Sequence, residues 1–258
     1  MNWPVSLVIA VNTVKGYARD RLFYGIIVFA ILFVMFAYLL ATLTIIEQRK
    51  IILDFGLSAI SLGGIVLAIF VGLNSVGKEI DNKTIYTILS KPVSRFAYIL
   101  GKFLGCAIVC IFTQMIMELV LGIIIQGAGE VMPVGIFGCY YLMALESILI
   151  LSVAIFFSLS ISSSFLAGTL TMGIFLIGRS TTTIAVIMNH VNSTVGRFFL
   201  RFVNDIFPAL GRFSVRELVA YGKIYPHEIL LSSTLYTFLY ISIFLFAAIS
   251  FFYKKDLR

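Results

Sequence analysis

Charged side chains inside long apolar runs are where this sequence could do chemistry. Glu118, Glu146 and Arg179 each lie in a stretch that is otherwise apolar. Gln114 precedes the first of them by one helical turn. Placing a charge at the centre of a membrane helix costs roughly 2.5 to 3.5 kcal/mol, so such a residue indicates a function or a partner. Either these four side chains line a polar path, or the arginine pairs with one of the glutamates or extends to the membrane surface.

A second candidate is the segment Gly72-Leu-Asn-Ser-Val-Gly77-Lys78, which matches the opening of a phosphate-binding P-loop. The match fails on chemistry, because Glu79 follows where a hydroxyl must bind Mg²⁺. The preceding residues also form an apolar run of membrane-helix length, where a P-loop requires a buried strand. We therefore expect no nucleotide site in this chain.

Histidines and cysteines are too few and too scattered for a metal or redox site. His190 and His227 lack acidic or thiol neighbours at metal-ligand spacing. Cys106 and Cys110 lie one turn apart in an apolar run, and Cys139 lies in another, so they are expected to pack as small apolar residues. No His-Glu-x-x-His, Gly-x-Ser-x-Gly or Cys-x-x-Cys motif occurs. The sequence predicts no catalytic site and no bound metal or cofactor.

The elements that carry these residues are apolar runs long enough to cross a membrane. The 258 residues are 60% hydrophobic and only 12% charged, with a mean hydropathy of +1.07, which excludes an ordinary soluble domain. Continuous apolar patterning favours helices over barrel strands, because a helix satisfies its own backbone hydrogen bonds. The sequence predicts one all-α transmembrane domain over residues 1–258 with six spans, at about 22–46, 55–76, 103–126, 136–158, 165–188 and 229–252.

Basic residues predict the orientation of these spans. Eleven of the 19 lysines and arginines lie before the first predicted span, between the second and third, or after the last. An even number of spans then places both termini in the cytoplasm. The net charge of +7 suits an anionic membrane surface and requires no nucleic acid. Residues 1–21 have no cleavage site of a signal peptide and are expected to form a helix lying in the membrane interface.

The predicted connections on the outer side differ in length. Glu47–Asp54 is expected to be a tight charged hairpin, and Gly127–Gly135 a turn. The loop at residues 189–228 is longer and contains apolar residues at helical spacing, which predict an amphipathic helix against the outer membrane surface that Pro208 ends. These residues are Val191, Val195, Phe198, Phe199, Phe202 and Ile206. A second short element is expected at 215–221.

The inner loop at residues 77–102 is predicted to form a helix, a break and a second helix. An apolar stripe starts near Ile80 and ends at Pro92, which disfavours helix in the residue before it. Ser94 can cap the helix that leads into the third span. A short amphipathic helix held between two spans could dock into a groove of a soluble partner, whereas an ordinary solvated basic loop is the alternative.

At this loop the sequence resembles the membrane subunits of ATP-binding-cassette transporters of the type-2 export class. Its likeness is nearest to the permeases grouped with copper-site maturation of nitrous oxide reductase. The resemblance covers nearly the whole chain, including the spacing of the six spans, and departs from the family pattern at Ala209, where relatives often carry Asn. The matching residues are Glu79, Lys83, Thr84, Leu89, Pro92, Arg95, Gly101 and Lys102.

The resemblance implies a permease subunit of an ATP-driven exporter in a bacterial inner membrane. It implies a homodimer, or a pair with a similar subunit, bound to two cytosolic ATPase subunits that hold ATP and Mg²⁺. The helix near residues 80–90 would couple ATPase closure to the spans, residues 159–164 would make a second contact, and residues 1–21 would form an elbow helix.

Two other functions remain open at this stage. An intramembrane hydrolase or transferase acting on a lipid would use Glu118 or Glu146 with His190, provided that they meet in one water-filled cavity. A passive channel or assembly factor would act without a nucleotide-binding partner. The substrate does not follow from the sequence, and the direction of transport follows from the resemblance alone.

Overall fold

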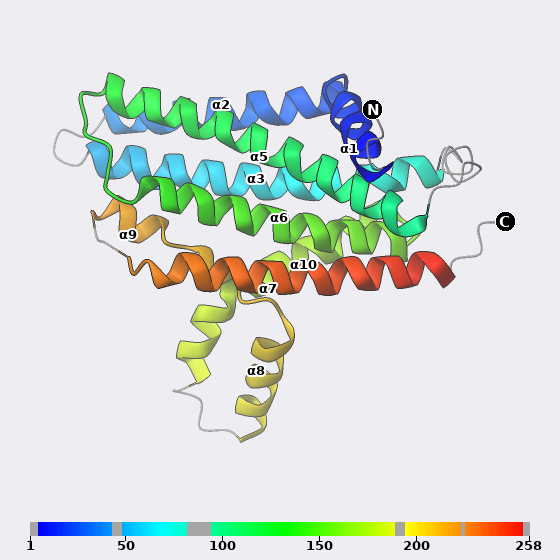
Figure 1. The fold of residues 1–258 in the computed structure, drawn as a ribbon. Helices are drawn as coiled ribbons and strands as arrows, with labels where there is room; N and C mark the ends of the chain where they lie inside the picture. The colour runs from blue at the N-terminus through cyan, green and yellow to red at the C-terminus, as the bar shows by residue number, and fades with distance from the viewer. Residues whose placement is uncertain (1–4, 43–47, 82–93, 189–193, 223–224, 255–258) are drawn as a thin grey trace.

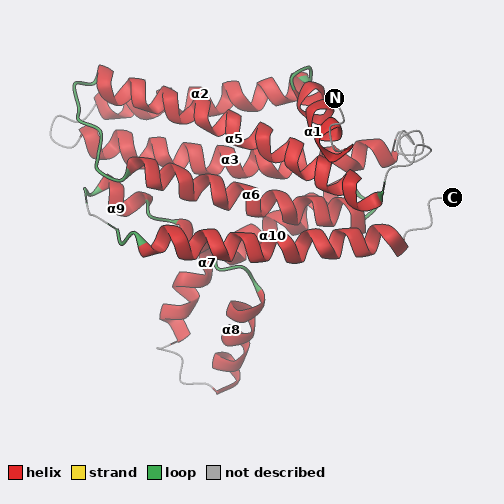
Figure 2. Ribbon diagram, in the orientation of Figure 1, coloured by secondary structure: helices red, strands yellow, loops and turns green. Residues whose placement is uncertain are grey.

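The computed structural model of this chain describes residues 5–42, 48–81, 94–188, 194–222 and 225–254. These residues are almost entirely helical and contain no strand (Figure 2). The helices are α1 (Val5–Tyr17), α2 (Arg21–Thr42), α3 (Gln48–Asp81), α5 (Arg95–Gly127), α6 (Ile136–Ser160), α7 (Ser164–Met188), α8 (Thr194–Ile206), the 3₁₀ turn η1 (Leu210–Phe213), α9 (Arg216–Ala220) and α10 (Glu228–Lys254).

The long helices lie side by side as a bundle, with α3 and α6 at its centre and α2, α5 and α10 around them (Figure 1). Five of them, α3, α5, α6, α7 and α10, are long and apolar enough to cross a membrane. The protein is therefore an all-α membrane protein. The first predicted span coincides with α2, which has 22 residues and no charged residue after Arg21; that it crosses the membrane stays a prediction.

Helix boundaries differ from the predicted spans mainly where charged residues flank the apolar core. The hairpin expected at Glu47–Asp54 is wrong, since α3 begins at Gln48 and already includes Asp54. With 34 residues this helix is about 51 Å long, well beyond a hydrocarbon layer of about 30 Å. Hydropathy marks where lipid ends, but a helix continues through charged residues into water. The turn expected at Gly127–Gly135 is present between α5 and α6.

Small residues allow the two central helices to pack closely. A Cβ atom at Gly72 of α3 would lie 2.5 Å from the Cβ of Ala154 in α6, so only glycine fits there. One turn along, Ser158 Oγ donates a hydrogen bond to the Leu73 carbonyl at 2.9 Å. Such contacts replace the hydrophobic effect as the source of cohesion, because lipid tails are as apolar as the side chains.

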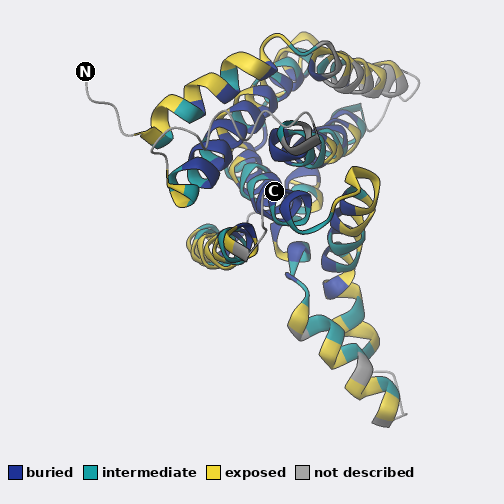
Figure 3. Cartoon of the chain, turned by 90° about the vertical axis from the view of Figure 1, so that its right-hand side faces the viewer, coloured by how far each residue is buried: buried dark blue, intermediate teal, exposed yellow. Residues whose placement is uncertain are grey.

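Helix α1 lies across one end of the bundle against α5 (Figure 3). Two glycines of α5 make this contact possible, since a Cβ at Gly101 would lie 2.6 Å from the Ser6 carbonyl oxygen and one at Gly105 would lie 2.7 Å from that of Ala10. The Tyr17 hydroxyl at the end of α1 donates to the Val71 carbonyl of α3 at 2.6 Å. Helix α1 is thus fixed to two long helices.

The end of α7 and helix α8 project away from the bundle as a pair (Figures 1 and 3). The helix predicted in the loop at 189–228 is present as α8 and ends before Pro208, and α9 corresponds to the second short element. Several apolar side chains of α8 are exposed, among them Val195 at 79% and Phe198 at 73%. They are consistent with a surface that meets lipid or another chain.

Substituting Gly105 tests the close approach of α1 and α5. We expect Gly105→Ala to lower the free energy of unfolding by about 1 to 3 kcal/mol, because the added methyl group overlaps the α1 backbone. Thermal unfolding in detergent can be followed with a thiol-reactive dye, since Cys106, Cys110 and Cys139 are all free and buried.

Gly173→Ala in α7 is the matched control. A Cβ there meets nothing within 4 Å, and alanine favours helix over glycine by up to about 1 kcal/mol. Its unfolding temperature should stay the same or rise. Equal destabilisation by both substitutions would contradict the packing described.

Candidate functional site

Four of the eight residues predicted to couple to a partner lie in the described part of the chain. Glu79 is on the last turns of α3, and Arg95, Gly101 and Lys102 are on the first turns of α5. Lys83, Thr84, Leu89 and Pro92 lie outside the described residues, as does the break expected between two helices. The described residues therefore frame the segment 82–93 from both sides.

Glu79 joins the end of α3 to the start of α5. Its carboxylate accepts a hydrogen bond from the Tyr98 hydroxyl and forms an ion pair with Lys102, whose Nζ lies 2.5 Å from Oε1. The two charged side chains are only 23% and 10% exposed. A pair so shielded from water interacts more strongly than an exposed surface pair. An ion pair thus holds together α3 and α5, the helices that precede and follow residues 82–93.

Arg95 joins the start of α5 to the end of the C-terminal helix, α10. It donates to the Phe252 and Tyr253 carbonyls at 2.5 and 3.2 Å, and its guanidinium lies 5.3 Å from the centre of the Phe252 ring. These are among the last carbonyls of α10, where an arginine also interacts favourably with the helix dipole. Ser94 caps α5 as predicted, with its Oγ 3.2 Å from the Ala97 nitrogen.

The glycine of the predicted Gly101-Lys102 pair has a structural contact of its own. Gly101 faces α1, whereas Lys102 faces Glu79. Two neighbouring residues of α5 therefore contact two different helices: Gly101 contacts α1, and Lys102 contacts α3. No signal in the sequence identified Tyr98 or Tyr17 as part of this region, although both are buried aromatic residues with a polar tip that finds an acceptor.

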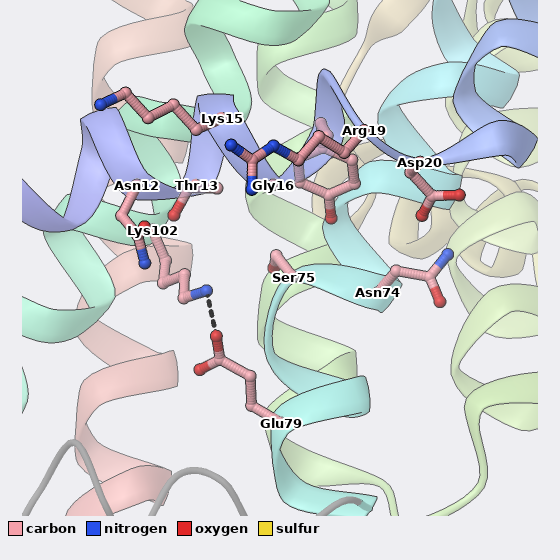
Figure 4. Close-up of a pocket in the computed structure, with 11 residues that line it drawn as sticks. Asn12, Thr13, Lys15, Gly16, Arg19, Asp20, Asn74, Ser75, Glu79 and Lys102 are labelled. Atoms are coloured by element: carbon pink, nitrogen blue, oxygen red, sulfur yellow. Dashed lines mark hydrogen bonds and ion pairs between the residues drawn. The ribbon is translucent and has the colours of Figure 1, made fainter.

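A cavity of about 440 Å³ lies between α1 and the ends of α3 and α5 (Figure 4). Its polar lining includes Asn12 and Arg19 from the α1 side and Asn74 and Glu79 from α3. Tyr17 also borders it, and burial raises the pKa of this hydroxyl, which keeps it neutral and able to donate. The sequence did not predict this cavity, because its lining comes from three separate segments.

The second group of predicted residues lies deeper in the bundle. Arg179 of α7 donates to the Glu146 carboxylate of α6 as an ion pair, and Glu146 is only 1% exposed. Arg179 also donates to Ser214 Oγ at 3.5 Å. Arg216 lies nearby in α9, where burial and the charge of Arg179 lower its pKa. This buried pair thus links α6 and α7 to the segment that follows α8.

Gln114 and Glu118 do not join that pair. Gln114 is buried and accepts from Ser147 Oγ at 3.1 Å, while its Nε2 has no hydrogen-bond partner among the described residues. Glu118 borders a separate groove of about 400 Å³ together with Met115 and Tyr140. Within the described chain, the four polar side chains therefore occupy three different surroundings.

The structure also shows the conformation of the P-loop-like segment and the surroundings of possible metal ligands. Gly72 to Lys78 lie within the continuous helix α3, so they do not form the loop that a phosphate site requires. In the described residues, no group of three His, Cys, Asp or Glu side chains could hold a metal ion. His190, which the enzymatic alternative needs, lies outside the described residues.

Removing either partner of the Glu146–Arg179 pair should destabilise the protein strongly. Glu146→Leu or Arg179→Met alone leaves an uncompensated buried charge, which costs about 3 to 5 kcal/mol. The double variant should recover most of this loss, because two apolar side chains replace a neutralised pair. Thermal unfolding of all four proteins in the same detergent measures the coupling.

Glu118→Leu serves as the control, because the described residues offer this carboxylate no ion-pair partner. Adding Arg179→Met to it should give additive losses. Additivity between Glu146 and Arg179, or coupling between Glu118 and Arg179, would contradict the pairing seen here.

Comparison with known proteins supplies the family. A comparison with curated proteins finds no match. A family model described as "ABC-2 family transporter protein" matches residues 7–257, which is nearly the full length. The match includes the helices that hold Glu79, Arg95 and Lys102 and those that hold the Glu146–Arg179 pair. The chain belongs to the ABC-2 family and is a multi-pass membrane permease component of an ABC transporter.

Proposed function

We propose that this chain is the permease subunit of an ATP-driven exporter and that residues 77–102 couple it to separate cytosolic ATPase subunits. Two such chains, or one chain and a similar subunit, would form the substrate path in a bacterial inner membrane. ATP and Mg²⁺ would bind to the ATPase subunits. The likeness to permeases of nitrous oxide reductase maturation stays a prediction and names no substrate.

The observation that carries this proposal is the set of contacts on both sides of residues 82–93. Glu79 contacts Tyr98 and Lys102, and Arg95 contacts the last turns of α10. These contacts tie together the ends of α3, α5 and α10 that lie next to this segment. This is the connection that a soluble motor needs in order to act on a membrane bundle.

The proposed coupling would work through rigid helices. Movement of residues 82–93 would reach α3 directly, and α3 packs on α6 through the contact of Gly72 with Ala154. Helix α6 in turn holds Arg179 of α7 through Glu146. ATP binding would thus shift the dimer between inward-facing and outward-facing states by changing how these packed helices lie.

The arrangement of the helix ends supports cytoplasmic termini. Helix α1, the end of α3, the start of α5 and the end of α10 all lie at one end of the bundle (Figure 1). The short basic flanks at residues 15–21, 78–102 and 254–258 include or adjoin these helix ends in the sequence. Positive flanks favour the cytoplasmic side, so this end would face the cytoplasm and an ATPase there.

The two alternatives make different demands. An enzyme acting on a lipid needs a free carboxylate near a base. Glu146 is engaged by Arg179, so this role would fall to Glu118, for which the described residues offer no ion-pair partner. A passive channel or assembly factor needs no partner that hydrolyses ATP. Purified protein that turns over a lipid, or conducts solute in vesicles without nucleotide, would favour one of these alternatives over coupled transport.

Combining Pro92→Ala with Arg95→Glu tests the coupling. The charge reversal removes the contacts to α10 and places a carboxylate beside the carbonyls of Phe252 and Tyr253. In nanodiscs with the cognate ATPase, we expect the chain to stay in the membrane while stimulation of ATP hydrolysis falls about tenfold, within the usual range of coupling free energies.

Arg212→Glu is the control, because Arg212 also contacts an aromatic ring, that of Tyr236 at 4.4 Å, but lies in η1 on the segment after α8. It should leave the stimulation close to that of the wild type. Unchanged stimulation in the Pro92→Ala, Arg95→Glu variant would overturn the proposed coupling.

A further inference from the structure

The cavity beside α1 continues into an apolar groove. The groove has a volume of about 450 Å³ and shares five lining residues with the cavity, namely Asn12, Thr13, Lys15, Glu79 and Lys102. It extends the space along α1 to Val8 and Val11, which are 56% and 45% exposed. One continuous space therefore has a polar end and an apolar end.

Positive charge is in excess at the polar end. Lys102 is neutralised by Glu79, with Nζ 2.5 Å from Oε1. Asp20 also borders the cavity and interacts with another residue. Lys15 and Arg19 also border the cavity, and no carboxylate among the described residues pairs with either of them. Figure 4 shows these two side chains on α1, separate from the Lys102–Glu79 pair, which joins α5 to α3. Two cations are thus available for an anion.

The position of this space indicates where the anion comes from. The cavity lies beside Lys102, directly before the apolar run that begins at Phe103, and α1 crosses the bundle at this level (Figure 1). The polar end would therefore meet the headgroup layer, while the groove along Val8 and Val11 would open toward the hydrocarbon. A free anion would leave the apolar end empty, whereas a phospholipid would fill both ends.

We propose that this space binds an anionic phospholipid, with its phosphate between Lys15 and Arg19 and part of an acyl chain along Val8 and Val11. The bound lipid would complete the attachment of α1 to α3 and α5. This proposal is independent of ATPase coupling, because neither basic residue belongs to the contacts on which that coupling rests.

Native mass spectrometry of the purified full chain in mild detergent tests the proposal, with phosphatidylglycerol and phosphatidylcholine as probes. The wild type should retain phosphatidylglycerol preferentially. The Lys15→Gln, Arg19→Gln variant should bind it about 25-fold more weakly, because each basic side chain near an anionic surface contributes about 1 kcal/mol, or roughly fivefold. Phosphatidylcholine binding should change little.

Arg197→Gln with Arg201→Gln is the matched control, since it removes the same charge from exposed positions of α8. It should bind phosphatidylglycerol as the wild type does. When no lipid is added, both variants should unfold at the wild-type temperature. Equal weakening in the two variants, or no weakening in the first, would overturn the site. So would displacement of the lipid by inorganic phosphate at equal concentration, because the site would then bind phosphate alone.

Discussion

The contacts of the Glu79 carboxylate are the interactions on which the end of the bundle next to residues 82–93 depends. The carboxylate draws Tyr98 and Lys102 to α3 and so closes the start of α5 onto the end of α3. Two glycines of α5, Gly101 and Gly105, then allow α1 to pack directly against the α5 backbone. Because a partly buried charge must be satisfied, this end of the bundle can rearrange only if all of these side chains find new partners together.

The Glu146–Arg179 pair lies farther along the bundle, and Glu146 is more deeply buried than Glu79. Its charges therefore also require partners. Glu146 and Arg179 hold α6 to α7, and Ser214 and Arg216 bring in the segment after α8. In lipid there is little hydrophobic force to hold helices together, so small residues and polar contacts decide their packing. The two charged clusters, joined by the packing of α3 on α6, give the bundle one contact network from end to end.

The sequence predicted the helical class, the positions of most long apolar helices, the α5 cap at Ser94 and the helix at α8, because each depends on local composition or spacing. It did not predict where helices end beyond the lipid, as α3 shows by including Asp54. It also left open whether Arg179 meets Glu118 or Glu146, since the two glutamates lie in different helices and only packing decides. Tyr17 and the cavity beside α1 depend on segments far apart in the chain, which periodicity in one segment cannot reveal.

The length of α3 has a mechanical consequence. A continuous helix of 34 residues spans about 51 Å, so a tilt of about 10° around its middle would move its two ends by about 4 Å in opposite directions. Its final turns carry Glu79, and its first turns hold Lys50, which lies over the ring of Tyr221 at 4.4 Å. By tilting as one rigid element, α3 can widen the bundle at one membrane surface while it narrows the bundle at the other.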